Sequence, residues 1–82
     1  MDLKLAIMKR FLRKLINLNI WDGRHRELKN LQKSLPAHLR GSKEAKKAIK
    51  ELINRGFLNI KQSTGEKNVS LNSHRQKRFL NF

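Results

Sequence analysis

The sequence contains no cysteine, and this absence excludes disulfide bonds, thiolate metal sites and a thiol nucleophile. It also lacks a long apolar run, because the longest uninterrupted one extends only from Leu5 to Met8. A membrane-spanning helix needs roughly 20 consecutive apolar residues, so the sequence predicts none. The N-terminus alternates apolar and basic side chains instead of forming an apolar block. We therefore expect no secretion signal and a cytoplasmic protein.

Acidic residues are also scarce, with 6 Asp and Glu against 20 Lys and Arg. Glu44 and Glu51 lie about 10 Å apart along a predicted helix with lysines between them, so they do not form a carboxylate pair. His25, His38 and His74 lie in separate segments amid basic residues, whereas a zinc site needs about four ligands in tetrahedral order. We therefore expect no enzymatic activity, no metal, no cofactor and no small-molecule substrate.

The formal net charge of +14 indicates a polyanionic partner. So basic a domain repels itself when compact, and this repulsion is usually tolerated where the partner is polyanionic. Solubility alone needs a net charge of only about 2–8. Nucleic acid is the expected partner, and an anionic membrane surface is the rarer alternative. Because the basic residues are spread evenly along the chain, a binding surface must arise from the way the helices are phased.

The length of 82 residues leaves room for one domain, covering residues 1–82. We place its core in about residues 3–72. Residues 73–82 are predicted to be a basic C-terminal extension with a last turn of helix. This extension contains three apolar anchors: Phe79, Leu80 and Phe82.

Residues Leu3 to Leu18 are predicted to form an amphipathic helix. One half of its helical wheel is apolar: Leu5, Ile7, Met8, Phe11, Leu12, Leu15, Ile16 and Leu18. The other half is polar: Lys9, Arg10, Arg13, Lys14 and Asn17. In so small a chain an apolar arc this wide is needed for the core, so we expect a core helix. A helix that binds a membrane surface or a partner is the alternative.

A second helix is predicted from about Arg24 to Leu35, after a short extended piece at Ile20–Trp21. It ends there because Pro36 disfavours the α conformation for the residue before it. A short link follows over residues 36–41, with one helical turn that has Pro36 at its first position.

The third helix is predicted from Lys43 to Arg55, with Ser42 as its N-cap and Gly56 after its last turn. Its inward positions are apolar: Ala45, Ala48, Ile49, Leu52 and Ile53. Its outward positions are four lysines and one asparagine: Lys43, Lys46, Lys47, Lys50 and Asn54. Glu44 and Glu51 fall on the flank, where Lys47 and Arg55 can pair with them. Solubility does not require this displacement of the acids, so the outer face is a candidate binding surface.

Two alternating segments, residues 57–61 and 68–72, predict a β-hairpin. The side chains expected to face the core are Leu58, Ile60, Val69 and Leu71. The connection over residues 62–67 is rich in turn residues, and Gly65 supplies its positive-φ position. Because a lone hairpin is marginally stable in water, its apolar face is expected to cover the helices.

The order of these elements resembles a winged helix-turn-helix domain. The strongest match is Ala45–Leu58, which resembles the recognition helix and the start of the first wing strand. Leu35–Gly41 and Val69–Asn72 are similar to segments of small archaeal winged-helix proteins. The resemblance covers about residues 3–72 and implies a mainly α fold with a small β-hairpin, consisting of three helices and a two- or three-stranded wing sheet.

The resemblance implies duplex DNA binding by a small transcriptional regulator, with the third helix in the major groove and the wing on the backbone. The groove-facing positions it implies are Lys43, Lys46, Lys47, Lys50 and Asn54. The wing positions it implies are Lys61, Ser63, Thr64 and Lys67. Arg40, in the link beside His38, is a further candidate phosphate contact.

Two departures from the family pattern bear on this interpretation. The link between the second and third helices is longer than a tight turn, and the outer face of the third helix has no Arg or Gln to read bases bidentately. Asn54 lies at the far end of the helix, so phosphate contact is better supported than base readout. Two alternatives therefore stay open: an RNA- or ribosome-associated winged helix, and a protein-interaction module, including a homodimer through the N-terminal helix.

Overall fold

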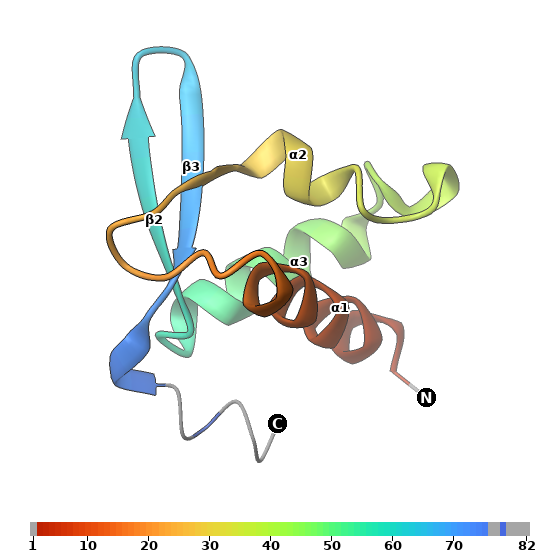
Figure 1. Cartoon of the computed structure of the whole chain (residues 1–82). Helices are drawn as coiled ribbons and strands as arrows, with labels where there is room; N and C mark the ends of the chain where they lie inside the picture. The colour runs from red at the N-terminus through yellow and green to blue at the C-terminus, as the bar shows by residue number, and fades with distance from the viewer. Residues whose placement is uncertain (1, 76–77, 79–82) are drawn as a thin grey trace.

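The computed structural model describes residues 2–75 and residue 78. Its elements are α1 (Leu3–Asn17), β1 (Arg26–Glu27), α2 (Leu28–Gln32), the 3-10 helix η1 (Ala37–Leu39), α3 (Lys43–Asn54), β2 (Leu58–Ser63), β3 (Glu66–Leu71) and the 3-10 helix η2 (Ser73–Arg75). The strands form an antiparallel sheet in the order β1-β3-β2. Within the described residues the fold is therefore mixed α/β, with three α-helices beside a small sheet (Figure 1).

The N-terminal helix α1 supplies much of the core. Asp2 caps it, because the Asp2 carboxylate accepts a hydrogen bond of 2.9 Å from the backbone N–H of Lys4. Its buried side chains are Ile7, Met8, Phe11, Leu12 and Leu15. Ile16 lies at the edge of the apolar arc and is 42% exposed. The expected core helix is confirmed.

The predicted start of the second helix is wrong. Arg26 and Glu27 are extended and pair with Val69 and Asn68 of β3, so α2 begins only at Leu28. The backbone groups on the free side of β3 determine this conformation, and they belong to a segment distant in sequence. The helix also ends early, at Gln32, and a turn then carries the chain to the buried side chain of Leu35.

The extended piece predicted at Ile20–Trp21 is confirmed. The Leu71 N–H donates to the Ile20 carbonyl at 2.8 Å, and the Leu71 carbonyl accepts from the Asp22 N–H at 3.0 Å. Trp21 forms an isolated parallel bridge with Leu71. The loop after α1 is therefore held against the end of β3.

Both predicted ends of the third helix are close to those observed. The Ser42 hydroxyl accepts a hydrogen bond of 3.2 Å from the Ala45 N–H, which confirms the N-cap. At the other end, Gly56 has φ +76° and its N–H donates to the Ile53 carbonyl, while the Phe57 N–H donates to the Leu52 carbonyl. This pair of bonds is a Schellman motif. Helix α3 therefore ends at Asn54, with Arg55 as its C-cap.

The hairpin is longer than predicted, and its connection is shorter. Ser63 pairs with Glu66, so Thr64 and Gly65 alone form the turn in place of residues 62–67. Leu58, Val69 and Leu71 are buried as expected, but Ile60 is 43% exposed. Ile60 lies on the inward face, opposite the buried Val69 of β3, but the burial predicted for it is wrong, because Ile60 belongs to the edge strand β2 and Val69 to the central strand.

The core lies between α1, α3 and the base of the hairpin. One continuous cluster of buried apolar side chains draws on α1, α2, α3, β2 and β3, and the half-buried Trp21 and Leu39 pack against it. The C-terminal extension is described only through η2 and at residue 78. The three anchors predicted for it lie outside the described residues: Phe79, Leu80 and Phe82.

Candidate nucleic-acid interface

The outer face of α3 carries all five side chains predicted to point outward. We call this face the lysine ridge: Lys43, Lys46, Lys47, Lys50 and Asn54, all exposed. The opposite face is apolar, with Ala45, Ala48, Ile49 and Leu52 buried in the core. The predicted phase of the helix is therefore confirmed, and one side of α3 presents four ammonium groups to solvent.

The acidic side chains of α3 do not neutralise the lysine ridge. Glu51 lies 3.4 Å from the Lys4 ammonium and 3.7 Å from the Arg55 guanidinium, and these are the ion pairs within the described residues. The predicted Arg55–Glu51 pair is thus present, whereas no Lys47–Glu44 pair forms in this part of the chain. No carboxylate of the described residues forms an ion pair with the ridge lysines.

The hairpin places its predicted contact residues near an exposed tip. Lys61, Ser63, Thr64 and Lys67 are all exposed. The strand register puts Lys61 and Ser63 on one face, while Lys67 shares the other face with Ile60. The two wing lysines therefore point to opposite sides of the hairpin.

A shallow groove of about 250 Å³ separates the hairpin tip from α2. Lys67 and Gly65 line it from the hairpin, and Lys29 and Gln32 line it from the helix. Glu27 and Glu66 also line this groove and balance the charge of its two lysines, unlike the lysine ridge.

Arg40 has a structural role in the link between α2 and α3. Its Nε donates to the Leu35 carbonyl at 2.9 Å, and its Nη2 donates to the Lys33 carbonyl at 3.2 Å. These bonds satisfy carbonyls just beyond α2 that lack helical partners. Arg40 thus holds the long link between α2 and α3 in place. Its guanidinium group is engaged by these two carbonyls.

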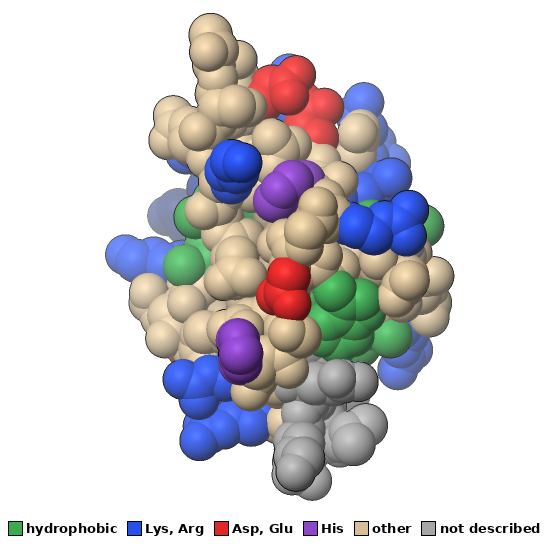
Figure 2. Space-filling view, turned by 60° about the vertical axis from the view of Figure 1, so that its left-hand side comes forward, with side chains coloured by type: hydrophobic (Ala, Val, Ile, Leu, Met, Phe, Trp, Pro, Cys, Tyr) green, Lys and Arg blue, Asp and Glu red, His purple; other side chains and the backbone are tan. Residues whose placement is uncertain are grey.

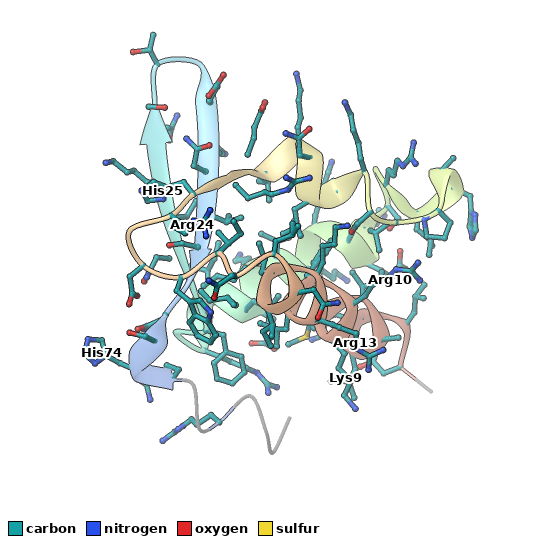
Figure 3. All side chains as sticks on the ribbon, viewed as in Figure 1. Lys9, Arg10, Arg13, Arg24, His25 and His74 are labelled. Carbon is teal, nitrogen blue, oxygen red and sulfur yellow. The ribbon has the colours of Figure 1, made fainter. Side chains whose placement is uncertain are left out.

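Sequence reasoning missed a second basic surface. An open groove of about 620 Å³, which we call the α1 groove, lies between α1 and the turn after α2, and is lined by Ala6, Lys9, Arg10, Arg13, Lys14, Asn17 and Ser34. Figure 3 shows Lys9, Arg10 and Arg13 projecting from α1 on the side of the molecule away from the hairpin. The polar half of the α1 helical wheel was the sequence signal for the basic side chains of this groove. The sequence gives no signal for Ser34, because a tertiary contact brings this residue beside α1.

Basic side chains are not confined to these surfaces. On the hairpin side of the molecule, Lys and Arg side chains lie around the margin and do not gather into one patch (Figure 2). The even spread of charge along the sequence is therefore also seen on this face.

Asp22 is the acid whose pKa is clearly perturbed in the described chain. Its carboxylate accepts hydrogen bonds from the Ser73 hydroxyl and the Ser73 N–H, and these bonds lower the pKa of Asp22 below its ordinary range. The neighbouring His74, labelled in Figure 3, lowers the pKa further. This arrangement joins the loop after α1 to η2 and has no catalytic partner in the described residues.

The described residues contain no cluster of three or more His, Cys, Asp or Glu side chains placed to hold a metal ion. In the same part of the chain, no helix combines the length and the apolar character needed to cross a bilayer. No protein-family model, curated protein or solved structure matches the chain. A function must therefore be argued from the surfaces described above.

Proposed function

We propose that the chain is a winged helix-turn-helix protein that binds duplex DNA, with α3 in the major groove and the hairpin along the backbone. The observation that carries the proposal is the lysine ridge, which is exposed, without close carboxylates, and next to a protruding hairpin. The element order supports it, since it is the order that resembles a winged helix-turn-helix domain.

The dimensions of α3 suit a major groove. Its 12 residues span about 18 Å, and a helix with side chains is about 10–12 Å across, close to the width of the groove. Lys43, Lys46, Lys47 and Lys50 occupy the first two turns or so, where they reach phosphates on the groove walls.

The chemistry of this surface favours phosphates over bases. The lysine ridge has no Arg or Gln for bidentate readout, and Asn54 lies at the far end of α3. We therefore propose binding with little sequence preference, in which phosphate contacts supply most of the free energy. A regulatory role in transcription would then depend on the hairpin or on DNA shape for its selectivity.

Charge reversal on the lysine ridge tests the proposal. Lys46→Glu combined with Lys50→Glu is expected to abolish binding of a labelled duplex at physiological salt in a fluorescence titration, with an unchanged circular dichroism spectrum. Arg10→Glu combined with Arg13→Glu is a matched control, because it makes the same change in net charge on α1. The assignment of the ridge is wrong if the α3 variant binds as tightly as the wild type.

Duplex RNA is the second candidate partner, and the spread of cations around the hairpin side favours it (Figure 2). Binding to unpaired bases is less well supported, because Trp21 is half-buried and packs against the core instead of forming a stacking platform. Competition between duplex DNA and duplex RNA of equal length separates the two. We expect DNA to compete more strongly, because α3 does not fit the narrow major groove of A-form RNA.

A further inference from the structure

The α1 groove concentrates cations within a short distance. Lys9 and Arg10 are adjacent, and Arg13 and Lys14 follow them one helical turn later, so the four side chains share one side of α1 and span about 7.5 Å along its axis. Phosphates on one DNA strand recur about every 3.4 Å along the duplex axis. Two or three successive phosphates therefore match the length of this cluster.

No acidic side chain lines the α1 groove, and α1 itself contains no Asp or Glu. The ion pairs of the described residues both involve Glu51, which lies on α3 and pairs on α1 with Lys4. Lys9, Arg10, Arg13 and Lys14 therefore take part in no ion pair within that part of the chain. The groove has the positive charge to neutralise an anion.

The α1 groove and the lysine ridge lie on different sides of the molecule. Helices α1 and α3 pack against one another through their buried faces, and each turns its charged face away from this contact. Figure 3 shows Lys9, Arg10 and Arg13 on α1, at the side of the molecule opposite the hairpin. A duplex seated on α3 and the hairpin would therefore leave the α1 groove open.

The chemistry of the groove favours a nucleic-acid backbone over other anionic partners. Among the described residues that line it, Ala6 alone is apolar, whereas protein partners are usually anchored by buried aromatic or aliphatic side chains. A membrane surface would require α1 to insert an apolar face, but that face is buried in the core. A row of four cations fits a repeating anion better than a single small one.

We propose that the α1 groove binds the backbone phosphates of a second nucleic-acid duplex, so that one molecule joins two duplexes. This inference rests on the proposed function, since the first duplex is the one bound by the lysine ridge. The polar side chains of Asn17 and Ser34 lie at the groove margin, where they add neutral contacts to sugar and phosphate oxygens.

Energy transfer between two labelled duplexes tests this inference. A donor-labelled and an acceptor-labelled short duplex are mixed with limiting wild-type protein, and transfer is expected to appear and then to fall as excess protein saturates each duplex separately. Arg10→Glu combined with Arg13→Glu is expected to reduce transfer by about tenfold or more. The same variant is expected to bind a single duplex within about threefold of the wild type, because charges beyond about 10 Å are screened.

The outcomes separate the two proposals. The inference is overturned if the wild type gives no energy transfer. It is also overturned if the α1 variant gives as much transfer as the wild type, because two copies of the chain would then be joined in another way. Failure of the proposed function gives a different result, in which Lys46→Glu combined with Lys50→Glu binds a single duplex as tightly as the wild type. The milder pair Arg10→Gln and Arg13→Gln repeats the test with a smaller charge change.

The α3 variant also tests the nature of the occupant, because it keeps the α1 groove and lacks the lysine ridge. At low salt it is expected to retain weak binding to duplex DNA, and polyglutamate is expected to bind it less tightly. Tighter binding of polyglutamate would overturn the inference and assign the groove to an acidic protein segment.

Discussion

At the scale of single residues, Gly56 sets the angle between α3 and the hairpin. Its φ of +76° places it in the left-handed region that favours glycine, and its carbonyl accepts a hydrogen bond of 2.9 Å from the Asn72 side chain. A Cβ at this position would lie 3.2 Å from the Arg75 Nε. Backbone geometry and close packing therefore both favour glycine here.

Replacing Gly56 by alanine is expected to destabilise the protein by about 1–2 kcal/mol, the cost of left-handed backbone in an L-residue. Urea unfolding measures the change. Gly41→Ala is the matched control, because no atom lies within 4 Å of a Cβ added there and its φ is not positive, so we expect a change within about 0.5 kcal/mol. Equal effects of the two substitutions would contradict the role given to Gly56.

A second residue-scale feature is the bond between Asp22 and Ser73, which links segments far apart in the chain. Because the folded pKa of Asp22 lies below its ordinary value of 3.8, the ionised carboxylate stabilises the fold above that pH. This contribution is lost as the pH falls through the folded pKa.

Asp22→Asn is therefore expected to lower the melting temperature at pH 7. The difference from the wild type should shrink as the pH falls below the ordinary value of 3.8 and through the lowered pKa of Asp22, because the folded wild-type carboxylate is then protonated. Thermal melts of both proteins across this range measure the difference. A difference that stays constant down to strongly acidic pH would mean that the charge of Asp22 contributes nothing.

At the scale of elements, local patterns and long-range contacts differ in what the sequence reveals. The cap at Ser42, the end at Gly56 and the inner face of α3 were predictable, because each depends on residues within one or two turns. The strand β1 was not, because pairing with β3 determines the conformation of Arg26 and Glu27. Alternation also could not show that β2 is an edge strand, so the exposure of Ile60 opposite the buried Val69 was missed.

The candidate site also has a part that local sequence patterns predict and a part that depends on long-range contacts. The outward position of the lysine ridge follows from helical phase alone. The α1 groove requires Ser34 to lie beside α1, and the role of Arg40 depends on carbonyls that the end of α2 leaves free. These features arise from tertiary contacts between elements and carry no pattern of their own in the sequence.

The boundary of the core along the hairpin gives a prediction at the element scale. Leu58→Ala is expected to cost about 2–4 kcal/mol, because this side chain is 2% exposed in the core. Ile60→Ala, two residues further along the same face, is expected to cost less than about 1 kcal/mol, because Ile60 is 43% exposed. Urea unfolding of the two variants compares them. A larger loss at Ile60 would mean that the outer hairpin is covered in solution.

At the scale of the whole molecule, the net charge of +14 is carried on more than one face. The lysine ridge, the α1 groove and the cations around the hairpin side surround a small apolar core. Such a distribution favours binding to a phosphate backbone with little base readout, because close carboxylates neutralise neither the ridge nor the groove. It also makes affinity depend steeply on salt.

The salt dependence of duplex binding tests the central claim most directly. If α3 and the hairpin neutralise about six phosphates, a plot of log affinity against log salt concentration has a slope near −5. A titration of labelled duplex by the wild-type protein over a series of salt concentrations measures this slope. A slope shallower than about −2 would contradict phosphate binding by the lysine ridge.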